Sequence, residues 1–251
     1  MLLDQYEKLL GRNSEGGGLS IQSLAAWHFL FDCQKGFGIS GSMIEIGVWH
    51  GVSLAAMRMH ASVHETVHGF DIALQREELD KTFHSVLGSA VGISLREINS
   101  INLRKVGFGS GSYRFVHIDG EHSYNAVRYD LELAEMAICD GGIVVVDDFF
   151  NIQSACVTHA VFDALAARPF ALRMFLAGGN KAYLSTPRFF AAYRKKALHD
   201  FVSFAEHEFA ERIMLCQNSH GTEIDYVTFC SRYGDYEGMK IGQWLEEPPE
   251  F

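Results

Sequence analysis

Two stretches of this sequence decide its fold: Phe115-Val-His-Ile-Asp-Gly-Glu-His122 and Gly141-Gly-Ile-Val-Val-Val-Asp-Asp148. In each, an apolar run rich in β-branched residues ends abruptly in acid. Such a run predicts a strand that is buried on both faces, as in a parallel sheet. Ligands bind beyond the carboxyl ends of parallel strands, so we expect Asp119, Asp147 and Asp148 to lie at one site.

These three carboxylates would repel one another unless a positive charge joins them. A divalent cation such as Mg²⁺, which prefers oxygen ligands, is the simplest counter-charge. We therefore predict Asp119, Asp147 and Asp148 as metal ligands; the alternative is that they only cap the helices that follow. His122 follows Asp119 by one turn and titrates near neutral pH, which makes it the candidate general base. His117 lies within the strand and is predicted to be structural.

Apolar periodicity along the chain alternates between strands and helices. It predicts strands at 43–48, 66–71, 93–98, 113–119 and 143–147, and helices at 52–61, 75–87, 125–139 and 155–167. Two further strands, 170–175 and 181–185, flank a Gly-Gly-Asn turn and predict a β-hairpin. Repeated βα units that end in a hairpin predict a Rossmann-like, doubly wound α/β fold, mostly parallel with an antiparallel last strand.

Three segments are expected: N-terminal helices over 1–42, the catalytic domain over 43–186 and a C-terminal extension over 187–251. The extension carries a long helical pattern at 188–215 with six aromatic residues, more than a solvated helix exposes. Three roles stay open for it: packing on the parent domain, a lid over the acceptor pocket, or a homodimer interface.

The charge balance excludes several classes of partner. The net charge is −10 at pH 7, and no basic cluster is longer than Arg194-Lys-Lys196, which argues against nucleic acid and anionic membranes. The five cysteines form no CxxC motif and predict reduced thiols in a cytoplasmic protein. No apolar run is long enough to span a bilayer.

The loop Glu45-Ile-Gly-Val-Trp-His-Gly51 predicts a second part of the site. Its glycines let backbone approach a ligand, and the helix that follows offers free N–H groups. Glu45 would repel phosphate and favours a ligand with an amino group. Asp71 ends the second strand, where an acid often holds ribose hydroxyls. Alternatively, both acids are caps. GxGxxG is absent, so a nicotinamide cofactor is disfavoured.

In this order, these blocks resemble the class I S-adenosylmethionine-dependent methyltransferases. The matching segments are Ile44–Ser53, Gly69–Asp71, Phe115–Tyr124 with Asp130, and Gly141–Asp148. More narrowly, they look like the metal-dependent small-molecule O-methyltransferases, which include macrocin-type sugar methyltransferases and, more distantly, catechol methyltransferases. The resemblance covers about residues 20–186.

The resemblance implies a role for each motif residue. The residues implied to contact the cofactor are Glu45, Gly47, Gly51, Ser53, Asp71, Asn99, Ser100 and Asp119. The implied metal ligands are again Asp119, Asp147 and Asp148, and His122 takes the position of the proton acceptor. Many sugar-modifying relatives have Glu-Asp where this chain has Asp147-Asp148. The catechol enzymes have Lys at the base position, so His122 favours a less acidic alcohol.

The function implied by the resemblance is methyl transfer from S-adenosylmethionine to a hydroxyl of a small molecule, a sugar or a natural product, assisted by Mg²⁺ and His122. Two alternatives from other classes remain, a metal-dependent hydrolase and a non-enzymatic binding protein on the same fold. GxSxG is absent, so covalent catalysis through a serine has no support.

Overall fold

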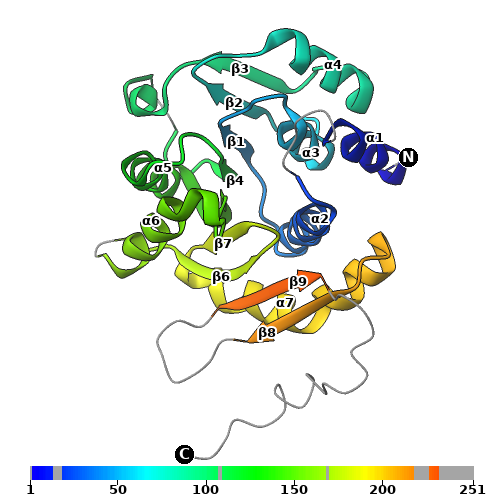
Figure 1. Cartoon of the computed structure of the whole chain (residues 1–251), viewed down its shortest axis with the longest axis vertical. Coiled ribbons are helices and arrows are strands. Elements are labelled where there is room, and N and C mark those ends of the chain that lie inside the picture. Colours follow the sequence, from blue (N-terminus) through cyan, green and yellow to red (C-terminus); the bar gives the residue numbers. More distant parts are fainter. Residues whose placement is uncertain (1, 14–18, 107–108, 168–169, 218–225, 232–251) are drawn as a thin grey trace, which may run out of the picture.

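The computed structural model describes residues 2–13, 19–106, 109–167, 170–217 and 226–231 (Figure 1). Within these residues, one sheet has the strand order β3-β2-β1-β4-β5-β7-β6-β9-β8. The strands are β1 (Ser42–Ile46), β2 (Val67–Asp71), β3 (Ile93–Glu97), β4 (Tyr113–Ile118), β5 (Ile138–Asp147), β6 (Arg173–Gly178), β7 (Lys181–Ser185), β8 (Ile213–Gln217) and β9 (Val227–Ser231).

Strands β1 to β5 pair in parallel, and β7 pairs antiparallel with β5. The predicted hairpin of β6 and β7 is confirmed. Its turn needs left-handed backbone, which Gly179 and Asn180 adopt with φ of 57° and 65°. The prediction of a Rossmann-like sheet, mostly parallel with an antiparallel last strand, is thereby confirmed. The register of β7 against β5 places Lys181 directly opposite Asp147.

Helices cover both faces of the sheet, which explains why its central strands bury apolar side chains on both faces (Figure 1). One core includes residues of α1 (Leu2–Asn13), α2 (Ile21–Gly36), α3 (Val52–His60), α4 (Arg76–Leu87) and α7 (Pro187–Phe209). The other includes residues of α5 (Tyr124–Ala137) and α6 (Ala155–Ala166). No helix in the described ranges is both long and apolar enough to cross a bilayer.

The C-terminal extension differs from its prediction as one helical pattern over 188–215. Helix α7 ends at Phe209, because Ala210 takes a left-handed conformation with φ of 53°. Residues 213–217 then form β8, which pairs with β9 and extends the sheet beyond β6. The extension is therefore not purely helical. Residues 218–225 and 232–251 lie outside the described residues.

Helix α7 packs back on the parent domain. Tyr193 and Phe201 are fully buried, and Phe201 contacts Phe29 of α2 at a ring-centroid distance of 5.2 Å. The Tyr193 hydroxyl donates a hydrogen bond of 2.6 Å to the carbonyl of Gly141. Packing on the parent domain thus accounts for much of the aromatic content of this segment. The dimer interface stays a prediction.

Candidate active site

The loop after β1 brings the ends of β1 and β4 into contact. Gly47 has φ of 86°, and a Cβ at this position would lie 1.9 Å from the carbonyl oxygen of Asp119. The N–H of Asp119 donates to the carbonyl of Ile46 at 2.8 Å. Gly51 begins α3 as its N-cap, with φ of 77°. Glycine at 47 is therefore needed for close packing, and the start of α3 offers N–H groups to a ligand.

Asp71 ends β2 and holds this loop. Its carboxylate accepts hydrogen bonds from the backbone N–H groups of Val48 at 2.8 Å, Trp49 at 3.2 Å and Ala73 at 2.9 Å. The alternative that Asp71 acts as a cap therefore describes part of its role. Each carboxylate oxygen has two lone pairs, so the same group can also accept hydrogen bonds from a ligand hydroxyl.

A cavity of about 1000 Å³ lies beside Asp71. It is lined by most of the residues predicted to contact a cofactor, namely Gly47, Asp71, Asn99, Ser100 and Asp119. Phe70, Ile72, Ile98 and Ile101 give it apolar walls. The structure thus brings together residues that follow four different strands.

Asp130 of α5 lies close to this cavity. Its side chain is almost completely buried, and its Oδ2 would lie 3.5 Å from a Cβ at Gly120. Burial raises the pKa of Asp130 to about 6, although a hydrogen bond with Ser100 lowers it in part. Asp130 therefore holds its proton more strongly than an exposed aspartate.

A second, smaller cavity of about 310 Å³ adjoins the first. Trp49, Asp119 and Gly120 line both of them. The smaller cavity is also lined by Gly51, Ser53, His122, Asp147 and Lys181. Trp49 is 58 % exposed and has φ of 47°, an uncommon value outside glycine that is often found at functional sites. The two cavities therefore form one continuous site with Asp119 at its centre.

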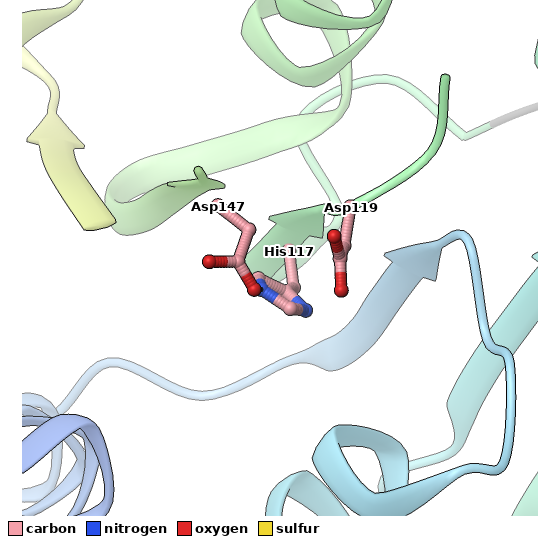
Figure 2. A group of neighbouring side chains, drawn as sticks. All are labelled: His117, Asp119 and Asp147. Carbon is pink, nitrogen blue, oxygen red and sulfur yellow. The ribbon is translucent and has the colours of Figure 1, made fainter. Parts of the chain in front are cut away.

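The three predicted metal ligands do not form a single group of three carboxylates. They divide into two groups that share Asp119, and within each group the candidate ligand atoms lie within 4.8 Å of one another. We call His117, Asp119 and Asp147 the inner group, and Asp119, His122 and Asp148 the outer group. Figure 2 shows the inner group, in which the imidazole ring lies between the two carboxylates.

In the inner group, Asp147 is already paired with cations of the protein. Its Oδ2 accepts a short hydrogen bond from the Lys181 ammonium and lies 3.6 Å from Nε2 of His117. Burial would raise the pKa of Asp147, but Lys181 and His117 hold it well below its usual range. Its Oδ1 accepts the backbone N–H of Asp148 at 2.8 Å. Lys181 therefore supplies the positive charge that the sequence led us to expect from a metal.

In the outer group, His122 lies between two carboxylates. Its Nε2 is 3.5 Å from Oδ1 of Asp119, and its Nδ1 is 3.1 Å from Oδ2 of Asp148. Asp119 raises the pKa of His122, partial burial opposes this, and Asp148 and Asp147 add to the rise. Asp148 itself is left-handed, with φ of 56°. The predicted proximity of His122 to the acidic residues is therefore present.

Glu45 lies beneath the loop and lines neither cavity. It is fully buried, and its Oε1 is 2.7 Å from Nδ1 of His117. Burial raises the pKa of Glu45, whereas the hydrogen bond with His117 lowers it. Burial lowers the pKa of His117, but Asp147 and Glu45 raise it more, to about 9. The predicted contact of Glu45 with a cofactor stays a prediction.

Two residues of the site were missed or underrated from the sequence. His117 was expected to be structural, and it is the centre of a buried chain from Glu45 to Asp147. Lys181 was not singled out, yet it lines the smaller cavity and neutralises Asp147. The available signal was a lone lysine that opens an otherwise apolar strand next to a tight turn.

Comparison with known proteins supports a methyltransferase domain. Residues 44–149 match the family model described as a methyltransferase domain. A search of curated proteins found no match. The fold is similar to that of an O-methyltransferase from Bacillus cereus solved with SAH, with a TM-score of 0.56 and 13 % identity over 72 % of this chain and 90 % of that one. It is also similar to an SAH-bound methyltransferase from Podospora anserina, with a TM-score of 0.55 and 13 % identity over 74 % and 87 %.

A protein from Corynebacterium glutamicum has the same fold, with a TM-score of 0.55 and 13 % identity over 73 % of this chain and 89 % of that one. At this level of identity, the solved structures establish the fold alone. The segment matched by the family model contains the loop after β1 and four acidic residues of the site: Asp71, Asp119, Asp147 and Asp148. Residues 44–149 therefore match a methyltransferase domain, and the fold of the chain is similar to that of solved methyltransferases.

Proposed function

We propose that this protein transfers a methyl group from S-adenosylmethionine to a hydroxyl oxygen of a small molecule, such as a sugar or a natural product. The observation that supports this most strongly is the pair of unequal cavities that meet at Asp119. The larger one has apolar walls and an acid, Asp71, that suit an adenine ring and ribose hydroxyls. The smaller one adjoins it beside the start of α3 and suits the methionine end and the acceptor.

Methyl transfer from a sulfonium ion is an in-line displacement. The protein needs to align the acceptor oxygen, the methyl carbon and the sulfur, and to remove the hydroxyl proton. Alignment can contribute about 7–11 kcal/mol to the lowering of the barrier. We propose His122 as the proton acceptor, because it lines the smaller cavity next to Asp119. The two carboxylates beside His122 would stabilise the imidazolium that forms.

A divalent cation, most simply Mg²⁺, is part of the proposal. The outer group offers two carboxylates and an imidazole, and such donors fit a divalent cation. Asp147 fits this role poorly, because Lys181 and His117 already occupy its Oδ2. When bound, a cation would lower the pKa of an acceptor hydroxyl and fix its orientation. His122 would then act either as a ligand or as the proton acceptor.

The rival functions leave parts of the site unexplained. A metal-dependent hydrolase would use the carboxylates, but it would leave the cavity beside Asp71 without a role. A binding protein would not need His122 between two carboxylates. The acidic charge balance also favours a small-molecule acceptor over nucleic acid. We propose the cytoplasm as the location, because the sequence predicts reduced cysteines.

The test is a methylation assay with labelled S-adenosylmethionine and a library of sugar and natural-product alcohols, run with and without excess chelator. We expect label transfer to a subset of acceptors, with loss of turnover in chelator. Absence of transfer together with absence of cofactor binding would overturn the proposal. If methyl transfer continues in excess chelator, only the divalent cation is removed from the proposed function.

A further inference from the structure

Lys181 places a buried ammonium at the smaller cavity. It opens β7 directly opposite Asp147, and its side chain is 1 % exposed. The Trp27 ring covers it, with Nζ 5.9 Å from the ring centroid. Burying an ammonium is costly unless it is paired with an anion, and Asp147 is the partner of Lys181. The ion pair is therefore a fixed part of the site.

The ion pair changes what the inner group can bind. His117, Asp119 and Asp147 lie close enough together to hold a cation, with ligand atoms within 4.8 Å. A divalent cation bound to Asp147 would lie beside the Lys181 ammonium, and two like charges at this distance in a buried site repel strongly. The inner group has the ligands for a metal, but the Lys181 ammonium already provides the positive charge there.

The outer group differs in its surroundings. Oδ1 of Asp148 accepts hydrogen bonds from the neutral side-chain amides of Asn151 at 2.6 Å and Asn180 at 2.8 Å. Its Oδ2 lies 3.1 Å from Nδ1 of His122. Among the described residues, neither Asp119 nor Asp148 forms an ion pair with a lysine or arginine of the kind that Lys181 forms with Asp147.

The ion pair also supports the outer group. Asp147, held through Oδ2 by Lys181, accepts the backbone N–H of Asp148 through Oδ1 at 2.8 Å. This hydrogen bond is made at the residue that has the left-handed backbone, Asp148, with φ of 56°. An uncommon backbone conformation persists only where its surroundings hold it. Lys181 thus acts on Asp148 through Asp147.

We propose that Lys181 is a fixed internal cation that closes the inner group to divalent metals, directs them to the outer group and positions Asp148 there. Lys181 is a positioning residue in this scheme. Its effect on catalysis rests on the proposed function, whereas its effect on metal binding does not.

The test is Co²⁺ binding, followed by calorimetry and by the visible absorption of the ion, in the full chain. The variants are Lys181→Met, which removes the ammonium at similar length, and Lys181→Met/Asp147→Asn, which restores charge balance. Asp148→Asn probes the outer group. We expect wild-type protein to bind Co²⁺ in a way that Asp148→Asn abolishes. Lys181→Met should bind Co²⁺ at least about tenfold more tightly, and the double variant should lose this gain.

Three results would overturn the proposal: no gain in Lys181→Met, a gain that persists in the double variant, or wild-type binding that survives Asp148→Asn. Circular dichroism of the double variant, which carries no unpaired buried charge, separates misfolding from a binding effect. Titration of the same proteins with S-adenosylmethionine tests the proposed function separately. If the protein binds S-adenosylmethionine but the variants do not show the expected differences in Co²⁺ affinity, the role of Lys181 is refuted. The methyltransferase proposal is unaffected by that result.

Discussion

Gly47 offers a sharp test of how the site is built, because the three atoms nearest to a methyl group there are all backbone atoms. The added Cβ of Gly47→Ala would lie 1.9 Å from the carbonyl oxygen of Asp119, 2.4 Å from its carbonyl carbon and 2.8 Å from the nitrogen of Gly120. None of these atoms can turn aside, so the ends of β1 and β4 must separate. The φ of 86° adds conformational strain.

The cost has two parts. An L-residue in left-handed backbone costs about 1–2 kcal/mol, and forcing extra volume into a packed site costs about 1–3 kcal/mol. We expect Gly47→Ala to lose about 2–5 kcal/mol of unfolding free energy in urea and to lose affinity for S-adenosylmethionine in calorimetry. Separation of the strand ends would also strain the hydrogen bond from Asp119 to Ile46, now 2.8 Å long.

Gly88→Ala is the matched control. Gly88 is the C-cap of α4 with φ of 75°, and no atom lies within 4 Å of an added Cβ. Only the conformational part, about 1–2 kcal/mol, should be lost there, with cofactor affinity unchanged. Equal loss of stability in the two variants, or normal cofactor binding by Gly47→Ala, would refute the close contact between the two strand ends.

Three other residues give further predictions. Asp71→Ala should weaken S-adenosylmethionine binding by about 1.5–3 kcal/mol in calorimetry, and wild-type affinity would contradict the ribose contact. His122→Ala should lower kcat by about 10²–10⁴ without affecting cofactor affinity. Because Asp119 raises the pKa of His122, wild-type kcat should keep rising above the usual histidine range, and this rise should vanish in the variant. Burial raises the pKa of Asp130 from 3.8 to about 6, so the wild type should lose stability as pH rises through this window. Asp130→Asn lacks this titration, so its free energy of unfolding in urea, relative to that of the wild type, should increase by about 3 kcal/mol between pH 3 and pH 8. A difference that does not change with pH would exclude the raised pKa of Asp130.

Periodicity and strand ends made the fold and the position of the site predictable. Asp71 and Asp119 follow buried strands of a parallel sheet, and the carboxyl ends of such strands share one edge. That edge carries both cavities. The hairpin was predictable as well, because Gly179 and Asn180 tolerate the left-handed backbone that its turn requires.

The partners of the acidic residues were not predictable in the same way. Asp147 and Lys181 meet because of the antiparallel register of β5 and β7, two strands that α6 and β6 separate in the sequence. The sequence therefore did not reveal that Lys181 neutralises Asp147, and the metal itself stays a prediction. The end of α7 was also missed, because the helical pattern continues past Ala210, and only pairing with β9 shows that residues 213–217 form a strand.

The most direct test of the central claim is a calorimetric titration of the wild-type protein with S-adenosylmethionine. The account predicts saturable binding of one cofactor per chain, with competition by its demethylated product. Folded protein that gives no binding heat with either compound at millimolar concentration, and no displacement in a competition assay, would contradict it.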